Sequence, residues 1–412
     1  MDNKRYIAEN NQIGFVQYTH NDDTDMIACW QDRDTQKGYN YAFDGSLDDL
    51  SSIDITAFPF WVVAVDKSSG AKVGVLRLSS GEEQDLAIWI YPQHRGKGYG
   101  TEAFSLAVDY IFRNMNLRNI YAGCYCDNKA SLRMLENVGF SRYPAGDQQE
   151  ENCFTGEPTT QLSFVRTIFD GIHATNDYER SLFGAVKERF NDNLYRWFSE
   201  VRPDHYNSNF FTPISELTRN DVLAAVAFQK QRGINEVMFS TNYPVDLSIM
   251  DGYDCVEYSA YVMAMISDRS HLWQINEAVE IRDIHTHDIS ADILDVSDVP
   301  EKHREAVYRN MKMVLEVAKT HPEYHWLCAY KDGKRVGTAY AVEHNGFVEM
   351  DDLWVAEEYR HQRIGTTLMK HIVDHTHGIV YLHATANATP KDMYAKMGFE
   401  IIETVYEYYL EW

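Results

Sequence analysis

The sequence has no long apolar run and few cysteines, and both shortages limit the kind of protein that it encodes. No stretch reaches the roughly 18 apolar residues that a membrane-spanning helix needs. The first ten residues, MDNKRYIAEN, are polar and lack the apolar centre of a signal peptide. The six cysteines form no CxxC pair and no dense framework, which is typical of reduced thiols in a cytosolic protein. We therefore expect a cytoplasmic protein without a membrane segment.

Basic residues are scarce relative to acidic ones. The chain has 38 lysines and arginines against 62 aspartates and glutamates, which gives a formal net charge of −24 at pH 7. The simplest role of this charge is solubility, and a field of this sign also repels nucleic acids and anionic membranes, so we expect neither as a partner. A site for an anionic ligand has to carry its own positive charge, which makes Arg95 and Lys97 informative.

At 412 residues the chain is too long for one ordinary domain, and it contains an internal repeat. Trp61 to Pro92 reads as three antiparallel strands with Ser-Gly turns. Trp326 to Glu358 reads the same way, with strong hairpin signals at Asp332-Gly333 and Asn345-Gly346. The tryptophans that open the two meanders are 265 residues apart.

Each meander is followed by the same series of elements. A short basic turn, RGKGYG at 95–100 or RHQRIG at 360–365, leads into an amphipathic helix. A strand, a short helix that ends in Gly-Phe and a final strand follow in both places. Arg95 and Arg360, which open the two turns, are again 265 residues apart. This matched order predicts two copies of one fold, called here the first and the last copy.

The segment between the copies, about 167–276, differs from both. Apolar residues at helical spacing predict a helix over 178–198, and a second helix is predicted at 217–233 with a strand at 235–241. Asp251-Gly252-Tyr253 lies where the other copies have Gly-Phe. We interpret the segment as the second half of the same unit, without its meander or glycine turn.

The turn at 95–100 combines features that favour phosphate binding. A helix N-terminus presents unpaired N–H groups and partial positive charge, glycine lets the backbone approach a ligand, and arginine and lysine add charge. The P-loop pattern does not fit, because neither turn ends in GK[ST]. The dinucleotide pattern GxGxxG does not fit either, since Gly96, Gly98 and Gly100 are spaced GxGxG and follow antiparallel hairpins.

The order Arg-x-x-Gly-x-Gly after an antiparallel meander, then helix, strand, short helix and Gly-Phe, resembles the GNAT superfamily of acetyl-CoA-dependent N-acetyltransferases. The first copy most resembles the branch that acetylates ribosomal-protein N-termini, through DMIACWQDRDTQKGY (25–39), RGKGYGTEA and DNKASLRMLENVGF. The last copy resembles the general superfamily, through LWVAEEYRHQRIGTTLM and MYAKMGF. Together the two matches cover about two thirds of the chain.

The resemblance implies an α+β fold with a mixed sheet, repeated twice with a degenerate partial copy in between. The expected domains are 1–166, 167–276 and 277–412. In this family the fourth and fifth strands splay apart, and the pantetheine arm of CoA lies between them. Near the start of the last domain, we expect a helix beginning near Glu301 with Asp298 as its N-cap.

The resemblance also implies which residues bind acetyl-CoA. The turn's backbone amides would hold the pyrophosphate, and an asparagine at the start of the short helix would hydrogen-bond the pantetheine arm, with a helix cap as its alternative role. In the first copy the implied residues are Arg95, Gly96, Lys97, Gly98, Tyr99, Gly100, Thr101 and Asn128. In the last copy they are Arg360, His361, Gln362, Arg363, Ile364, Gly365, Thr366 and Asn387.

The last copy departs from the pattern, because His361 and Arg363 stand where the first copy has Gly96 and Gly98. If the position of Arg363 needs a positive φ, that residue costs about 1 kcal/mol there. If it does not, Arg363 adds a phosphate contact. We expect weakened cofactor binding in the last copy, and a dead site is the alternative.

Acetyl transfer to an amine needs proton transfers at two places. An amine with a pKa of about 10 is mostly protonated at neutral pH, so a base or a water relay must remove a proton. The leaving CoA thiolate needs an acid, which in many family members is a tyrosine four residues before the Gly-Phe glycine. Tyr394 has this position in the last copy, and a core tyrosine is its alternative role. The first copy has Leu135 there, with Ser131 as a weak substitute.

Candidate bases lie on the fourth strand of each copy, near the expected splay. They are Glu83 and Asp85 in the first copy, and Glu349, Asp351 and Asp352 in the last. Period-two alternation predicts Glu349 and Asp351 on one face of the strand and Asp352 on the other. Solvated surface carboxylates are the commoner role of such residues.

Four histidines gather near the end of the chain, at His371, His375, His377 and His383. The i,i+4 pair could bind a metal, but the sequence has no HExxH motif and no cysteine partner there. A solvated helix face is the better interpretation, and we expect no metal.

We predict an enzyme that transfers acetyl from acetyl-CoA to a primary amine of a small molecule or peptide by direct attack. The first copy is expected to bind the cofactor better, and the last has the recognisable acid. Two alternatives stay open, a catalytically weak CoA-binding sensor or scaffold and an aminoglycoside-type acetyltransferase. The residues do not identify the acceptor. Two linked copies can mimic the dimer of single-domain relatives, which favours a monomer.

Overall fold

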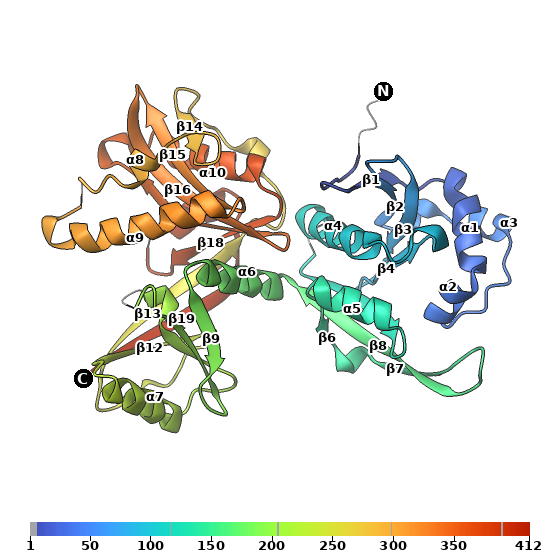
Figure 1. Cartoon of the computed structure of the whole chain (residues 1–412), viewed down its shortest axis with the longest axis horizontal. Coiled ribbons are helices and arrows are strands. Elements are labelled where there is room, and N and C mark those ends of the chain that lie inside the picture. The colour runs from blue at the N-terminus through green and yellow to red at the C-terminus, as the bar shows by residue number, and fades with distance from the viewer. Residues whose placement is uncertain (1–5, 116, 204–205, 298, 389) are drawn as a thin grey trace. The chain divides into compact units, whose positions relative to one another are not determined.

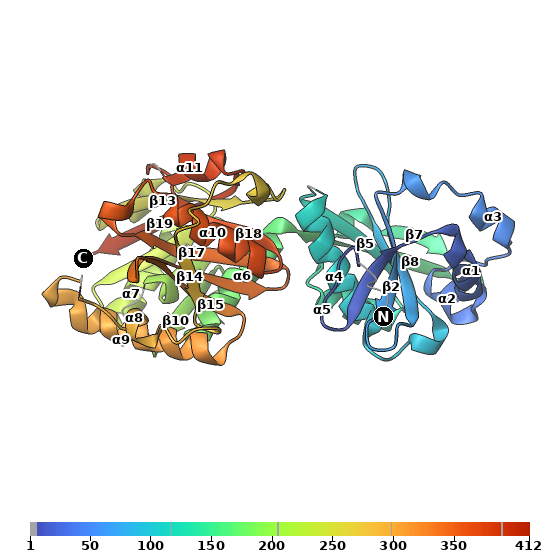
Figure 2. The ribbon, with the colours of Figure 1, turned by 90° about the horizontal axis from the view of Figure 1, so that it is seen from above.

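The computed structural model describes residues 6–115, 117–203, 206–297, 299–388 and 390–412. The chain forms two compact units, Met1–Gly171 and Ile172–Trp412, and both combine strands with helices (Figures 1 and 2). Among the described residues, no helix is long and apolar enough to cross a membrane. Asp298, the predicted helix cap, lies outside the described residues.

The first unit begins with a short strand and ends in a longer one. Its strands are β1 (Ile13–Gln17), β2 (Phe60–Asp66), β3 (Lys72–Leu78), β4 (Leu86–Ile90), β5 (Asn119–Tyr125), β6 (Ser141–Arg142), β7 (Gln148–Glu151) and β8 (Pro158–Thr167). Its helices are α1 (Asp23–Gln31), α2 (Arg33–Gly38), α3 (Leu47–Ser51), α4 (Tyr99–Asn114) and α5 (Lys129–Asn137). Helix α6 (Ile168–Leu182) connects the two units.

The predicted first meander is present as β2, β3 and β4, which form an antiparallel sheet in the order β1-β2-β3-β4. Alternate residues of these strands face two layers. Trp61 packs in a cluster with residues of α1 and α3, whereas the ring of Phe60 contacts that of Tyr110 on α4. The helix buries one apolar stripe, including Phe104 and Ile111, because its apolar residues recur at the helical period.

Strands β4 and β5 separate soon after they meet. They are joined by one parallel bridge, Asp85 with Tyr121, and by the hydrogen bond from the amide of Tyr121 to the carbonyl of Gln84. Beyond this point β5 belongs to a second sheet, in which it pairs with β8. The expected splay of the fourth and fifth strands is therefore present in the first copy.

The second unit contains the middle segment and the last copy. Its strands are β9 (Ala185–Arg189), β10 (Leu194–Ser199), β11 (Phe210–Pro213), β12 (Glu236–Thr241), β13 (Asp254–Ala264), β14 (Glu280–Asp283), β15 (Tyr324–Lys331), β16 (Lys334–His344), β17 (Phe347–Val355), β18 (Ile379–Thr385) and β19 (Glu400–Glu411). Its helices after α6 are α7 (Arg219–Gln231), α8 (Ser290–Ile293), α9 (Glu301–Thr320), α10 (Ile364–His375) and α11 (Pro390–Lys396).

The predicted last meander is present as β15, β16 and β17. Asp332 and Gly333, and Asn345 and Gly346, all have positive φ between 48° and 82°, which is the conformation that a two-residue hairpin with the right twist requires. Helix α9 lies along one face of β15 and β16 (Figure 1). Helix α10 covers the other face, where Leu368 and Ile372 pack against residues of β15, β16 and β17.

All strands of the second unit form one sheet, in the order β14-β15-β16-β17-β18-β13-β19-β12-β11-β10-β9. In the first copy β5 pairs with β8, the later strand of its own copy. In the second unit, the equivalent β18 pairs instead with β13 from the middle segment, and β12 of the middle segment pairs with β19 of the last copy. The middle segment and the last copy thus exchange their final strands, and they share one continuous sheet.

The prediction of a helix over 178–198 is wrong. Helix α6 ends at Leu182, Gly184 has φ of +69°, and β9 and β10 follow as an antiparallel pair. The turn residues Asn191 to Asn193 and the aromatic residues around them favour a hairpin, and a short apolar run cannot separate helix from strand by its period alone. The middle segment therefore has an antiparallel meander, β9-β10-β11, and the interpretation of this segment as a half unit without a meander is wrong.

The predicted fold class, an α+β fold with a mixed sheet that occurs twice, is confirmed, whereas the partial copy predicted between the two has a meander of its own. The structure groups the chain in two compact units. The predicted division into three domains at 166 and 276 stays a prediction.

Candidate functional site

The glycine turn of the first copy leaves the start of α4 open. Gly96 and Gly98 have φ of +72° and +84°, a region that residues with a side chain rarely adopt. Gly98 is the N-cap of α4, and no described side chain caps this helix. No described atom lies within 4 Å of a Cβ built on either glycine. The first-turn amides of α4 are therefore free to meet a ligand that approaches closely.

A cleft of about 430 Å³ lies at this turn. It is bounded by α2, the end of β4, the start of α4 and the start of α5. Its walls contain all the first-copy residues predicted to bind the cofactor except Lys97, whose exposed Nζ donates to the carbonyl of Gln93 at 3.0 Å. The lining residues that the sequence analysis had singled out are Arg95, Gly96, Gly98, Tyr99, Gly100, Thr101, Asn128 and Ser131.

The side chain of Arg95 lines the cleft but is committed to protein partners. Its Nη1 forms an ion pair with Asp32 at 2.7 Å, its Nε donates to the carbonyl of Ile90 at 3.1 Å, and its Nη2 donates to Thr35 Oγ1. The guanidinium thus fastens α2 to the end of β4. These contacts give Arg95 a structural role, and its predicted part in binding a phosphate stays a prediction.

Asn128 performs the alternative role that the sequence analysis left open. Its Oδ1 accepts from the amide of Ser131 at 3.2 Å, which caps α5, and its Nδ2 donates to the carbonyl of Gly38 at 3.4 Å. Asn128 and Ser131 both line the cleft. Leu135 is 1% exposed and packs in the interior.

The sequence analysis missed Tyr39 as a residue of the cleft. Its hydroxyl donates to the carbonyl of Ile88 at 2.5 Å, on the edge of β4 that β5 has left, and its ring stacks on Trp89 with centroids 5.4 Å apart. Tyr39 ends the stretch 25–39 that carries the resemblance, so a signal was present. No local pattern, however, shows that the tyrosine reaches across to β4.

The predicted base Asp85 lies at the β4–β5 bridge and is not a lining residue of the cleft. Burial raises the pKa of its carboxyl to about 6, against the opposing positive charge of Arg77. The other candidate, Glu83, precedes β4, is exposed and accepts a hydrogen bond from the hydroxyl of Tyr143 at 3.4 Å.

The turn of the last copy follows the same path with different residues. His361 and Arg363 have φ of +63° and +62°, so the position does require a positive φ and the cost of about 1 kcal/mol applies to Arg363 and to His361. Arg363 is the N-cap of α10, and no described side chain caps this helix either. Arg360 donates from Nε to the carbonyl of Val355 at 3.4 Å, as Arg95 does to that of Ile90.

The other predicted cofactor residues of the last copy differ in burial and in hydrogen bonding. The backbone carbonyl of Gln362 accepts from Asn276 Nδ2 at 2.9 Å, and its side-chain oxygen accepts from Lys331 Nζ at 2.7 Å. Ile364 is buried among core residues. Gly365 and Thr366 lie in the first turn of α10, and Asn387 is exposed.

Tyr394, the predicted acid, is 9% exposed and lies in the core beside α10, with its ring 6.0 Å from that of Phe399. Burial raises the pKa of its hydroxyl, and the negative charge of Asp351 adds to this. The surroundings are those of the alternative role, a core tyrosine. The role of acid stays a prediction.

The predicted base Glu349 belongs to a buried carboxyl pair. It is 5% exposed on β17, and burial raises the pKa of its carboxyl well above the usual value, with the charge of Glu179 on α6 as the next cause. Burial likewise raises the pKa of Glu179 to about 7. Glu349 Oε1 lies 3.7 Å from His383 Nδ1, and Oε2 is buried without a hydrogen-bond partner among the described residues.

Asp351 and Asp352 do not divide between the two faces as predicted. A bulge between β16 and β17 places two residues of β17 where one is expected, and Asp352 has φ of +49°. As a result, Glu179 of α6 interacts electrostatically with both aspartates. The hydroxyl of Tyr340 donates to Asp351 Oδ2 at 3.4 Å. The prediction failed because a bulge breaks the period of two on which it rests.

The four histidines near the chain end do not form one cluster. His371 and His375 stack on α10 with centroids 4.0 Å apart, whereas His383 lies on β18 near Glu349. The amide of His377 donates to Glu343 at 2.8 Å. The expectation that these four hold no metal stays a prediction.

Comparison with known proteins identifies a family for both copies. A family model described as acetyltransferase (GNAT) domain matches residues 5–141, and a second model with the same description matches residues 322–401. The two matches together cover more than half of the chain. The finer likeness to the ribosomal-protein branch stays a prediction.

Individual relatives match shorter stretches. The probable N-acetyltransferase YjcK of Bacillus subtilis is 47% identical over 49 residues, which are 12% of this chain and 27% of that protein. The spermidine N(1)-acetyltransferase of Vibrio cholerae is 34% identical over 56 residues, 14% of this chain and 32% of that protein. The chain thus aligns with about a third or less of the length of these two relatives.

Among solved structures, a functionally unknown conserved protein from Staphylococcus epidermidis is similar with a TM-score of 0.47 and 20% identity, over 56% of this chain and 95% of that one. The two family models and the shared sequence of elements lead to one conclusion: the chain belongs to the GNAT acetyltransferase family and carries two of its domains in tandem.

Proposed function

We propose that this chain is an N-acetyltransferase that binds acetyl-CoA in the cleft of the first copy and transfers acetyl to a primary amine of a small molecule or peptide. One observation carries the proposal. The uncapped start of α4, preceded by two glycines in left-handed conformations, opens into a cleft of about 430 Å³. The family match supports the reaction class.

The residues of this cleft fit the parts of acetyl-CoA. A diphosphate would meet the first-turn amides of α4 and the positive end of its dipole, and the absence of a Cβ at Gly96 and Gly98 lets it approach the backbone. The extended arm would lie along the edge of β4 at Ile88 and Ile90, which β5 leaves open when it pairs with β8. The carbonyls of Ile88 and Ile90 accept from Tyr39 and Arg95 in this structure, so these hydrogen bonds would have to give way where the arm pairs with the edge.

Acetyl-CoA would supply an activated thioester to the cleft. The carbon–sulfur bond breaks as the carbon–nitrogen bond forms. The ammonium gives up one proton to a base before the attack, and the attacking nitrogen then gives up a second, which ends on the CoA sulfur. Ser131 at the start of α5 lies in the cleft wall, and its hydroxyl can relay this second proton to the departing thiolate. Asp85, whose pKa of about 6 leaves it mostly ionised at neutral pH, is the candidate to accept the amine proton through water.

The last copy offers a second and more acidic environment for an amine. Asp351 and Asp352 are exposed on β17, beside the buried carboxyls of Glu349 and Glu179, and the negative charge of the two aspartates would favour a cationic acceptor. The name of the spermidine N(1)-acetyltransferase shows that a polyamine is the acceptor of one relative. We therefore include polyamines among the candidate acceptors.

Calorimetric titration of the full-length protein with acetyl-CoA tests the binding step. We expect at least one equivalent to bind, and no detectable heat at any temperature would contradict the proposal. A thiol-release assay with a panel of amines tests the transfer step. Turnover with a polyamine, an N-terminal peptide or an aminoglycoside identifies the acceptor class, whereas binding without turnover of any amine would favour a CoA-binding sensor.

A further inference from the structure

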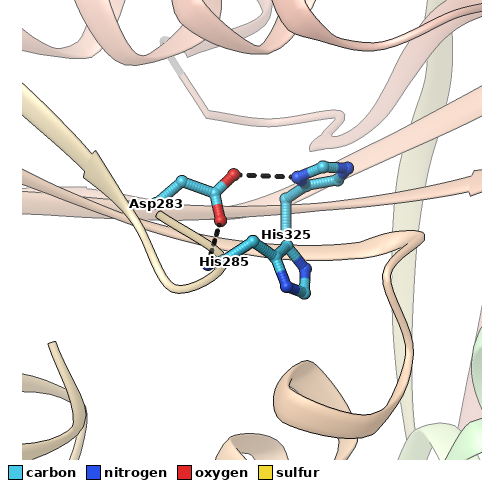
Figure 3. Close-up of side chains that lie close together, drawn as sticks. All are labelled: Asp283, His285 and His325. Carbon is cyan, nitrogen blue, oxygen red and sulfur yellow. Dashed lines mark hydrogen bonds and ion pairs between the residues drawn. The ribbon is translucent and has the colours of Figure 1, made fainter. Parts of the chain in front are cut away.

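Two histidines and one aspartate that belong to neither predicted cofactor site lie together at the edge of the second unit's sheet. Asp283 ends β14, His285 follows it in the next turn, and His325 is the second residue of β15. One potential ligand atom from each side chain lies within 4.8 Å of the other two, and Figure 3 shows the three side chains close together. Two of them come from neighbouring strands, 42 residues apart in sequence.

Each imidazole is already oriented through one of its nitrogens. His285 Nε2 lies 3.0 Å from the carbonyl oxygen of Tyr324, and His325 Nε2 lies 3.2 Å from Glu343 Oε1. If both nitrogens donate to these oxygens, Nδ1 of each ring is left as its ligand atom. Histidines that bind metals usually donate their other N–H to a carbonyl or a carboxylate in this way, which fixes the tautomer and the ring orientation.

Asp283 contacts both histidines, His325 through its ring and His285 through its backbone. Its Oδ2 lies 2.8 Å from His325 Nδ1, and its Oδ1 accepts from the backbone amide of His285 at 2.8 Å (Figure 3). The aspartate is only 9% exposed, and the side chain of His325 is 17% exposed. In the metal-free protein a proton occupies the position between Asp283 and His325, and a cation that binds both would replace it.

We propose that Asp283, His285 and His325 bind one transition-metal dication of the Zn²⁺ type, with Glu343 and the carbonyl of Tyr324 orienting the two imidazoles. Two imidazoles and one carboxylate suit zinc and similar borderline metals better than calcium or magnesium, which prefer all-oxygen sites. Bonds of about 2.0–2.2 Å place tetrahedral ligand atoms roughly 3.3 Å apart, so side-chain rotations suffice to close the set. The fourth position would hold water.

Such a metal would fasten a short edge strand. Strand β14 has four residues and pairs on one side, with β15. A metal held by Asp283 and His325 would join these two strands, and the support of Glu343 would extend the link to β16. The site would stabilise the second unit, and it is independent of the proposed acetyl transfer.

The test uses the full-length protein without a histidine tag, stripped of metal with a chelator. We expect one equivalent of Zn²⁺ to bind in calorimetry, and one equivalent of Co²⁺ to give the visible absorption bands of a tetrahedral site. Asp283→Asn and His285→Ala should each weaken Zn²⁺ binding by at least about 100-fold, and Glu343→Gln by about 10- to 100-fold. His287→Ala is the matched control, because His287 is exposed in the same turn, and it should bind as the wild type does.

The control and a stability readout keep the result decisive. Zn²⁺ should raise the melting temperature of the wild type and of His287→Ala, but not that of His285→Ala, whose exposed ring can be removed without a cavity in the core. If the stripped wild type binds Zn²⁺ no better than the Asp283→Asn, His285→Ala double variant, the three residues form only a hydrogen-bonded cluster and the proposal is wrong. An equal loss in His287→Ala would also overturn it.

Discussion

The turns before α4 and α10 have the same backbone path and different residues. Gly96 and Gly98 in the first copy, and His361 and Arg363 in the last, all have φ between +62° and +84°. Glycine adopts this region without a steric penalty, whereas a residue with a Cβ loses roughly 1–2 kcal/mol. The comparison shows that the same backbone path forms with or without glycine. Glycine at these positions lets a ligand approach the amides of the turn more closely, because it has no Cβ.

The strained turn of the last copy is held in place by its surroundings. Gln362, between the two left-handed residues, is fixed through its carbonyl by Asn276 and through its side chain by Lys331. A backbone in a sparsely populated region persists only where neighbouring contacts determine it. The side chains of His361 and Arg363 stand where the first copy exposes bare backbone, which supports weaker cofactor binding in the last copy.

The middle segment shows a third outcome at the same place in the fold. Helix α7 begins after Thr218, whose side chain accepts from the amide of Asp221, while Asp221 accepts from the amide of Thr218. This capping box satisfies with protein atoms the donors that α4 leaves open. The helix start of the middle segment is thus closed by its own side chains, whereas α4 and α10 start without a side-chain cap.

The largest expected effect comes from closing the first turn. Gly98→Asp places a carboxylate where the diphosphate would lie, and aspartate tolerates a positive φ better than most residues do. The loss of hydrogen bonds to a charged group, at about 1.5–3 kcal/mol each, should weaken acetyl-CoA binding by at least about 100-fold. Calorimetry of the full-length protein measures this.

Gly70→Asp is the matched control for this change. Gly70 also has a positive φ, of +73°, and no described atom within 4 Å of a built Cβ, but it lies in the hairpin between β2 and β3. This variant should bind acetyl-CoA as the wild type does. Unchanged binding in Gly98→Asp would show that the turn does not hold the cofactor.

The predicted base Glu349 of the last copy lies beside a second buried carboxyl, Glu179 of α6, and Glu179→Gln tests how this carboxyl affects stability. Burial raises the pKa of Glu179 from the usual 4.5 to about 7, so between these values the folded protein binds more protons than the unfolded chain. Stability contributed by this group is therefore present at low pH and lost as the pH rises toward 7. Glutamine removes that loss.

At pH 8 we expect Glu179→Gln to be more stable than the wild type by about 2 kcal/mol or less, with the difference disappearing near pH 4. Urea unfolding at both pH values gives the two free energies. Glu305→Gln, at an exposed position on α9, should change stability little at either pH. A Glu179→Gln variant that is equally destabilised at both pH values would contradict the pKa assignment.

A smaller effect is expected at the capped start of α7. Thr218→Ala removes the side-chain acceptor for the amide of Asp221 and should lower the free energy of unfolding of the second unit by about 1 kcal/mol. Acetyl-CoA binding should stay unchanged, because the middle segment holds no open helix start. A new binding event in this variant would show that capping alone had suppressed a third site.

The smallest effect is expected from relaxing the last turn. The double variant His361→Gly, Arg363→Gly removes two strained residues. Each new glycine also increases the entropy of the unfolded chain, which lowers the free energy of unfolding by about 0.4–1 kcal/mol. The net gain in the free energy of unfolding should be about 1 kcal/mol or less, measured in urea. If the double variant also gains acetyl-CoA binding, the two side chains were blocking the amides of α10, and a loss of binding would assign them a direct contact.

Local signals in the sequence were enough for the repeated half of the fold. The hairpin turns at Asp332-Gly333 and Asn345-Gly346, the meanders and the basic turns at the start of α4 and α10 all follow from residues close to one another in the chain. Turn residues, strand alternation and helix starts are short-range properties, so a single sequence reports them directly.

The assignment of individual side chains was less predictable. Arg95 is bound by Asp32, 63 residues away, and Asn128 reaches Gly38, 90 residues away. Asp352 changes face because β17 has a bulge opposite β16. No local pattern encodes these contacts, since they depend on which elements the fold brings together.

The sequence by itself determined that two copies of one unit exist, where their turns lie and which turn has glycine, because these features depend on neighbouring residues. Only the tertiary structure decided that β13 and β19 exchange places, that Glu179 meets Glu349, and that Asp283 and His325 lie side by side. These pairings join residues far apart in the chain, and they are selected by the burial and hydrogen bonding of a whole sheet.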